Sequence, residues 1–183
     1  MASFQTPTFS VREAGITAKR FHGWHHAGLL PFGIPEGRKN LLTFPEFIWV
    51  RLIDRLRTLG YPLGGIYSLK QFLFETRDGE LAQDQAEQRP SLLETVLARQ
   101  LADGGEVGVV LIPQGKPQVW MEASGGPRPN GTHLYLSLSE QVRDFRANRA
   151  LEGKERGLGL FTLLGSRETG MEATYDRQTE VGM

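Results

Sequence analysis

The spacing of apolar and polar residues predicts a short amphipathic helix over 18–27. Phe21 and Trp24 lie three positions apart on one side of it, with basic residues on the other sides. Thr17 stands where an N-cap is needed, because its hydroxyl can accept a backbone N–H of the first turn. Gly28 follows the last helical position and is expected to end the helix.

Two less regular segments flank this helix. Ser10 suits the N-cap of a further short helix over 10–14, and residues 15–16 then supply a tight turn. Residues 31–39 contain two prolines, two glycines and two basic residues, a composition that favours a loop. The order helix, turn, helix and loop is therefore expected in the first forty residues.

Two longer helices are expected next. Thr43 and Glu46 form a capping-box pattern, in which each side chain bonds the backbone N–H of the other residue, so a helix begins here. It is expected to end at Gly60, and Pro62 suits the first turn of another helix. Apolar residues repeat at helical spacing in both, as Phe47, Ile53, Leu56 and Leu59 in the first and as Leu63, Ile66, Leu69 and Leu73 in the second.

The second half of the chain predicts a smaller unit in which strands and helices are mixed. A polar, acidic, Gln-rich stretch suits a linker at residues 76–90. Beyond it we expect a helix, two strands joined by a turn, a third strand and a last helix, over 91–102, 107–112, 118–123, 133–136 and 137–150.

The fold class expected from these patterns is α+β, in two small domains. At 183 residues with 39% hydrophobic content, the chain is long and apolar enough to form a core. The first domain is expected to be mainly helical and the second α+β, followed by a Gly-rich, partly flexible tail; their ranges are 1–75, 91–152 and 153–183.

The amino-acid composition excludes several classes of protein. The chain has no cysteine, which excludes a disulfide framework, a thiolate metal site and a cysteine nucleophile. Its start lacks a signal-peptide pattern, and no apolar run approaches the roughly 18 residues of a membrane span. We therefore expect a cytoplasmic protein without membrane contact.

Charge is distributed unevenly although the formal net charge is zero. Residues 1–75 hold nine Lys/Arg against five Asp/Glu, whereas residues 76–183 hold twelve against sixteen. Since polyanion binders concentrate positive charge at the contact surface, this division favours nucleic-acid contact by the first half alone.

The stretch FSVREAGITAKRFHGWHHAGLL, a basic loop, and then LLTFPEFIWVRLIDRLRTLGYPLGGI resemble the MerR-like winged helix-turn-helix over about residues 8–75. The resemblance implies a transcription regulator that reads double-stranded DNA. It also implies a turn and cap at 15–17, with Thr17 as the cap. Its implied DNA contacts are Lys19, Arg20 and His22 in the major groove, Arg38 and Lys39 of the loop, or wing, on phosphates, and a further backbone contact by Arg51 or Arg55.

Physical argument supports the same contacts independently of the resemblance. A short capped helix fits the major groove, and its N-terminal side chains, here Lys19 and Arg20, are those that reach base edges. Basic residues in a loop, here Arg38 and Lys39, can follow phosphates, which supply affinity but little sequence information. A homodimer is expected, although the long pairing helix typical of the family is not evident, so pairing is expected through another surface.

Other classes remain open at this point. A DNA-bending architectural or excision factor of a mobile element would use the same fold, and a protein-interaction module without DNA binding would use similar surface charges. No nucleophile motif or complete phosphate loop is present, so we expect neither an enzyme nor a cofactor. His22 and His26 lie one helical turn apart, but without a nearby cysteine or a carboxylate in the same helix no metal site is expected. A small molecule or a protein could act as an effector at the second domain.

One charged helix face is expected to be solvated and partly self-paired. It carries Arg143, Arg146 and Arg149 beside Glu140 and Asp144.

Overall fold

The computed structural model describes residues 6–33, 41–74, 90–113, 115–122, 131–148 and 151. Within these residues the chain is an α+β fold with five helices and two small antiparallel sheets. The first half contains β1 (Phe9–Ser10), α1 (Ala18–His26), β2 (Leu41–Leu42), α2 (Phe44–Thr58) and α3 (Leu63–Phe74). The second half contains α5 (Leu92–Asp103), β3 (Val107–Leu111), β4 (Gln118–Met121), β5 (Leu134–Ser137) and α6 (Leu138–Ala147).

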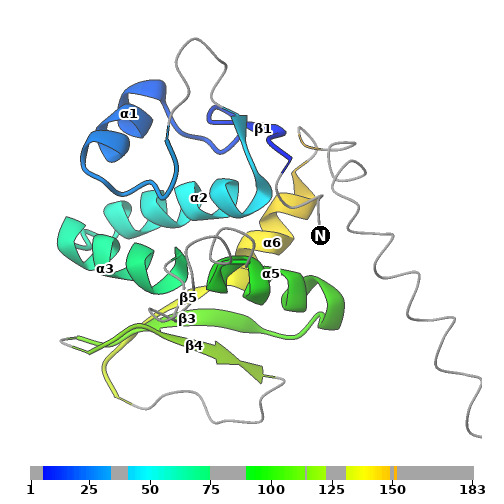
Figure 1. Ribbon diagram of the computed structural model, residues 1–183. Coiled ribbons are helices and arrows are strands. Elements are labelled where there is room, and N and C mark those ends of the chain that lie inside the picture. Colours follow the sequence, from blue (N-terminus) through cyan, green and yellow to red (C-terminus); the bar gives the residue numbers. More distant parts are fainter. Residues whose placement is uncertain are drawn as a thin grey trace, which may run out of the picture.

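The elements stack in layers (Figure 1). The three-stranded sheet, in the order β4-β3-β5, lies at one end; α5 lies between it and α2, and α6 runs from the sheet alongside α2 toward β1. The other end is formed by α1 and the small β1-β2 sheet, in which Phe9 pairs with Leu42 and Ser10 with Leu41.

The boundaries that Thr17, Gly28, the capping box and Gly60 predicted for two helices are confirmed. Thr17 caps α1, and the reciprocal capping box of Thr43 and Glu46 begins α2. Both helices end before a glycine with positive φ, Gly28 at 69° and Gly60 at 75°, a region that disfavours other residues.

The helix expected over 10–14 is wrong. β1 pairs with β2, and the chain then makes a single turn, in which the Ser10 carbonyl accepts the N–H groups of Glu13 and Ala14 at 3.0 and 3.3 Å. The Glu13 carboxylate in turn accepts the Ser10 N–H at 2.8 Å. Gly15, at φ 82°, ends this turn after too few residues to offset the cost of helix nucleation.

The ends of two apolar stripes also differ from expectation. Leu59 is 58% exposed and Leu63 44% exposed, whereas the inner stripe residues are buried. The two leucines stand where α2 ends and α3 begins, so the connecting bend carries their side chains away from the core.

The strands and last helices occur in the expected order with small shifts at their ends. β3 ends one residue earlier than expected, at Leu111, and β5 spans 134–137 instead of 133–136. β4 ends at Met121, and α6 ends at Ala147 instead of about residue 150.

One hydrophobic core runs through both halves of the chain. Phe145 of α6 packs against Phe9, Phe44 and Phe47, with ring centroids 5.2, 5.0 and 5.4 Å away. The division into separate domains at 1–75 and 91–152 stays a prediction, but the described residues of both ranges share this core.

The expected linker, apart from Pro90, the wing residues 34–39 and the tail at 153–183 lie outside the described residues. In the part of the chain that is described, no helix combines the length and apolarity needed to cross a membrane.

Candidate nucleic-acid interface

α1 is held in place from its buried side. Phe21 and Trp24 are 1% and 7% exposed, as the helical spacing predicts. Two hydrogen bonds from residues distant in sequence hold the segment that follows the helix. Trp49 of α2 donates its indole N–H to the Leu29 carbonyl at 2.9 Å, and Lys70 of α3 donates to the Gly28 carbonyl at 2.8 Å. The opposite face of α1 is therefore presented to solvent in a defined orientation.

That exposed face is polar and basic. Thr17 accepts the Arg20 backbone N–H at 3.4 Å, and the first turn contains no acidic residue. Lys19, Arg20 and His22 are all exposed. The three α1 side chains that sequence reasoning assigned to the major groove are thus all exposed.

Arg20 differs from its neighbours because it already has partners. Its guanidinium forms an ion pair with Asp54 of α2 and lies 5.2 Å from the centre of the Trp24 ring. Sequence reasoning missed Asp54, since nothing in the pattern of α2 indicates that it faces α1. A base contact by Arg20 would use the remaining donors of its five-donor guanidinium or exchange this carboxylate.

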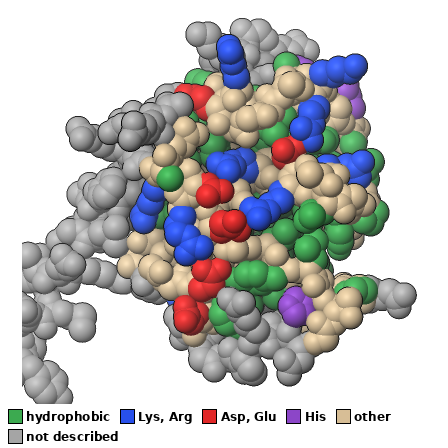
Figure 2. Space-filling model, turned by 180° about the vertical axis from the view of Figure 1, so that it is seen from behind, with side chains coloured by type: hydrophobic (Ala, Val, Ile, Leu, Met, Phe, Trp, Pro, Cys, Tyr) green, Lys and Arg blue, Asp and Glu red, His purple; other side chains and the backbone are tan. Residues whose placement is uncertain are grey.

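Arg51 and Arg55 face the second half of the chain. Arg51 lies 3.4 Å from Asp144, and Arg55 lies 3.3 Å from Glu140, both on α6. These arginines are therefore neighbours of α6 and lie apart from the outward face of α1. Figure 2 shows acidic and basic side chains alternating across this side of the molecule.

Arg143, Asp144 and Arg146 of α6 are exposed as expected, and Arg149 lies outside the described residues, but the same contacts correct the expectation that this face is partly self-paired. Glu140 and Asp144 pair with arginines of α2, and Arg143 lies 3.8 Å from Glu106 instead of pairing within its own helix. Spacing within α6 cannot reveal the arginine partners on α2, because they are 85 to 93 residues away along the chain.

Arg38 and Lys39 lie outside the described residues, so their place relative to α1 stays a prediction. The described chain ends on either side of their loop, at Gly33 and Leu41. Leu41 pairs with Ser10, so β2 begins beside the turn that precedes α1.

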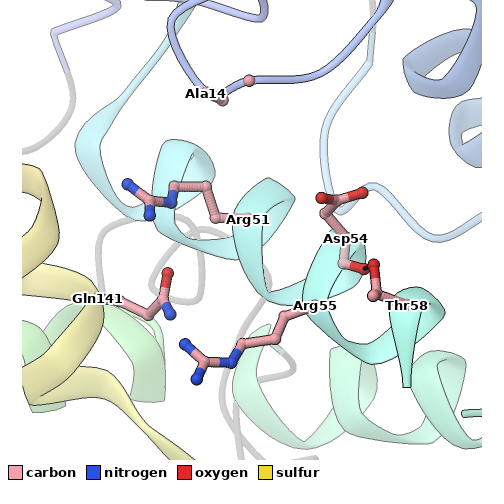
Figure 3. Close-up of a pocket in the computed structure, with 7 residues that line it drawn as sticks. Ala14, Arg51, Asp54, Arg55, Thr58 and Gln141 are labelled. Atoms are coloured by element: carbon pink, nitrogen blue, oxygen red, sulfur yellow. Dashed lines mark hydrogen bonds between the residues drawn. The ribbon is translucent and has the colours of Figure 1, made fainter.

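A polar cleft of about 310 Å³ lies between α2, α6 and the turn before α1 (Figure 3). Its walls include Arg51, Asp54, Arg55 and Thr58 of α2, Gln141 of α6, and Ala14 and Gly15 of the turn. No group of three or more metal-ligating side chains gathers in the described ranges of the chain.

Comparison of the chain with known protein families, with curated proteins and with solved structures finds no match.

Proposed function

We propose that this protein binds double-stranded DNA as a transcription regulator, with α1 in the major groove and the loop containing Arg38 and Lys39 on the phosphates. The observation that carries the proposal is the division of α1 into two faces. Phe21 and Trp24 anchor one face in the core, while the other exposes Lys19, Arg20 and His22 behind a capped first turn. Such a helix fits the major groove, with its N-terminal side chains toward the bases.

The resemblance of residues 8–75 to MerR-like regulators supports the same proposal. Within it, Thr17 closes the first turn of the groove helix, and Arg51 or Arg55 supplies a further phosphate contact after exchanging its carboxylate partner. We also propose a homodimer, because two half-sites increase both affinity and specificity. α5 does not offer the pairing surface, since its Leu93, Val96, Leu97 and Leu101 are buried in the chain's own core.

Separate variants of α1 and of the loop test this function. Lys19→Ala should weaken binding to a preferred site by roughly 1–3 kcal/mol while random DNA is affected less, because a base contact is lost. Replacing Arg38 and Lys39 together by Ala should weaken binding to all duplexes and lower the slope of log affinity against log salt by about two. Fluorescence anisotropy on selected and scrambled duplexes over a salt series measures both effects.

The matched control is Lys116→Ala, which removes an exposed lysine next to β4, far from α1. Equal losses of DNA affinity in Lys19→Ala and Lys116→Ala would show that α1 is not part of the DNA interface. Absence of DNA binding even at low salt would favour the protein-interaction alternative, for which the carboxylate partners of Arg20, Arg51 and Arg55 are the supporting observation. Strong bending of phased duplexes would favour the architectural factor of a mobile element.

A further inference from the structure

The cleft between α2 and α6 has features that the interface on α1 does not explain. At about 310 Å³ its volume is at the lower end of ordinary ligand clefts, which range from roughly 300 to 1,000 Å³. Most of its wall is formed by side chains with hydrogen-bonding groups, from two helices and a turn that are distant in sequence (Figure 3). The cleft therefore has well-defined polar walls and is large enough for a small ligand.

Gln141 is the most unusual of these side chains. It is only 3% exposed, and its amide makes no hydrogen bond to another described residue. The amide is not among the buried polar atoms of the described residues that lack a hydrogen bond, so it is accessible from the cleft and can bond water or a ligand there. In Figure 3 the amide extends from α6 into the space between Arg51 and Arg55.

The two arginines supply the charge for an anionic ligand. They stand one helical turn apart on α2, and each meets a single carboxylate of α6 at 3.3–3.4 Å. A guanidinium has five N–H donors, so each arginine keeps several for a ligand in the cleft. Two guanidiniums and an amide N–H suit the several oxygens of a phosphate, which arginine binds with two parallel hydrogen bonds.

Carboxylates near the cleft are expected to lower its affinity for an anion. Asp54 lines the cleft but is paired with Arg20, while Glu140 and Asp144 compete with any anion for Arg55 and Arg51. Removing one of these competing carboxylates should therefore strengthen binding of an anion. If these ion pairs only stabilised the fold, removing a carboxylate would leave the affinity for an anion unchanged.

We propose that the cleft formed by Arg51, Arg55 and Gln141 is a binding site for a phosphate group. The phosphate belongs either to a small phosphorylated ligand or to the DNA backbone. A phosphate there would join α2 of the first half to α6 of the second. Occupancy would consequently stabilise the packing of the two halves against each other.

The test is a titration of the full chain with inorganic phosphate in phosphate-free buffer, followed by calorimetry and by the melting temperature. Wild type should show saturable binding and a higher melting temperature with phosphate. Gln141→Leu, which keeps the volume and removes the amide, should weaken the affinity at least fivefold, and Arg55→Gln about tenfold. Glu140→Gln should strengthen it, because Arg55 loses its competing carboxylate.

The matched control is Arg146→Gln, which removes the same charge from an exposed position on α6 outside the cleft wall. Its phosphate affinity should equal that of wild type. The proposal is overturned if wild type shows no saturable phosphate binding, or if Gln141→Leu and Arg146→Gln bind phosphate equally well while both are folded.

Duplex binding by the same variants distinguishes the two phosphate sources. Loss of both phosphate and duplex affinity in Gln141→Leu assigns the site to the DNA backbone, whereas loss of phosphate affinity alone assigns it to a small ligand. Phosphate binding that persists in a protein without any duplex binding would leave this site standing and overturn the DNA-binding function.

Discussion

At the scale of single residues, burial changes the pKa of Glu46, which caps α2 together with Thr43. Its carboxylate accepts the Thr43 N–H at 2.7 Å, an arrangement that favours the ionised form. Burial nevertheless raises the pKa of Glu46 above its usual 4.5, and the neighbouring Glu94 raises it further, against the opposing hydrogen bonds from Thr43. The cap therefore holds a carboxylate that resists ionisation in the folded state.

We expect the wild-type protein to lose stability as Glu46 ionises with rising pH, and Glu46→Gln to abolish that loss. Because the folded pKa is raised, the folded state binds more protons than the unfolded state between pH 4.5 and the raised value. The contribution of Glu46 to stability is thus complete below pH 4.5 and declines as the pH rises through that window. Glutamine keeps the capping box but does not titrate.

Urea unfolding of wild type and Glu46→Gln at a series of pH values measures this effect. The free energy of unfolding of wild type, minus that of the variant, should decrease as the pH rises above 4.5 and then level off. A difference that increases with pH would mean that the ionised cap is the more stable form in the folded protein.

At the scale of elements, two kinds of contact join α6 to α2. The ion pairs of Arg51 and Arg55 are partly exposed, and such pairs contribute roughly 0–1 kcal/mol each. Phe145 is 1% exposed and touches three other phenylalanine rings, so its burial contributes several times more. Aromatic packing, and not the surface charges, therefore holds α6 in place.

Two sets of substitutions compare these contributions directly. Phe145→Ala should lower the free energy of unfolding by roughly 3–5 kcal/mol, because a buried aromatic is replaced by a cavity. A double-mutant cycle of Arg55→Gln and Glu140→Gln should give a coupling of about 0.2–1 kcal/mol. Denaturant unfolding measures both; a coupling as large as the loss in Phe145→Ala would show that the charges hold the helix.

At the scale of the whole molecule, the shared core has a consequence for unfolding. Phe9, Phe44 and Phe47 of the first half would lose a ring neighbour if the second half unfolded alone. Partial unfolding would expose this apolar surface to water at a cost that scales with its area. The two halves are therefore expected to unfold together, although the sequence suggests a linker between them.

Single-tryptophan variants test this cooperativity. Trp49 reports on α2 and Trp120 on β4, so chains that retain only one of these tryptophans follow each half by fluorescence. Both should give the same denaturant midpoint as far-UV circular dichroism, as a two-state transition requires. Separate midpoints in variants of equal overall stability would show two independent domains.

The sequence by itself determined the local elements, because their signals lie within a few residues of one another. The capping box of Thr43 and Glu46, the Thr17 cap, and the glycines after α1 and α2 were all recognisable and are confirmed. The α+β class followed from the change of apolar spacing between the two halves. The burial of Phe21 and Trp24 followed in the same way from helical periodicity.

The tertiary structure alone decided which distant residues meet. A turn after β1 stands where a helix over 10–14 was expected. β1 itself was not recognised, because its partner strand is more than thirty residues away and local propensity contains no information about that pairing. The partners of Arg20, Arg51 and Arg55 were equally hidden, since the sequence shows that a residue is charged but not which carboxylate the fold brings beside it. The Gln141 cleft exists only because α2, α6 and a turn converge, and that convergence is set by the packing of Phe145 in a core that both halves build.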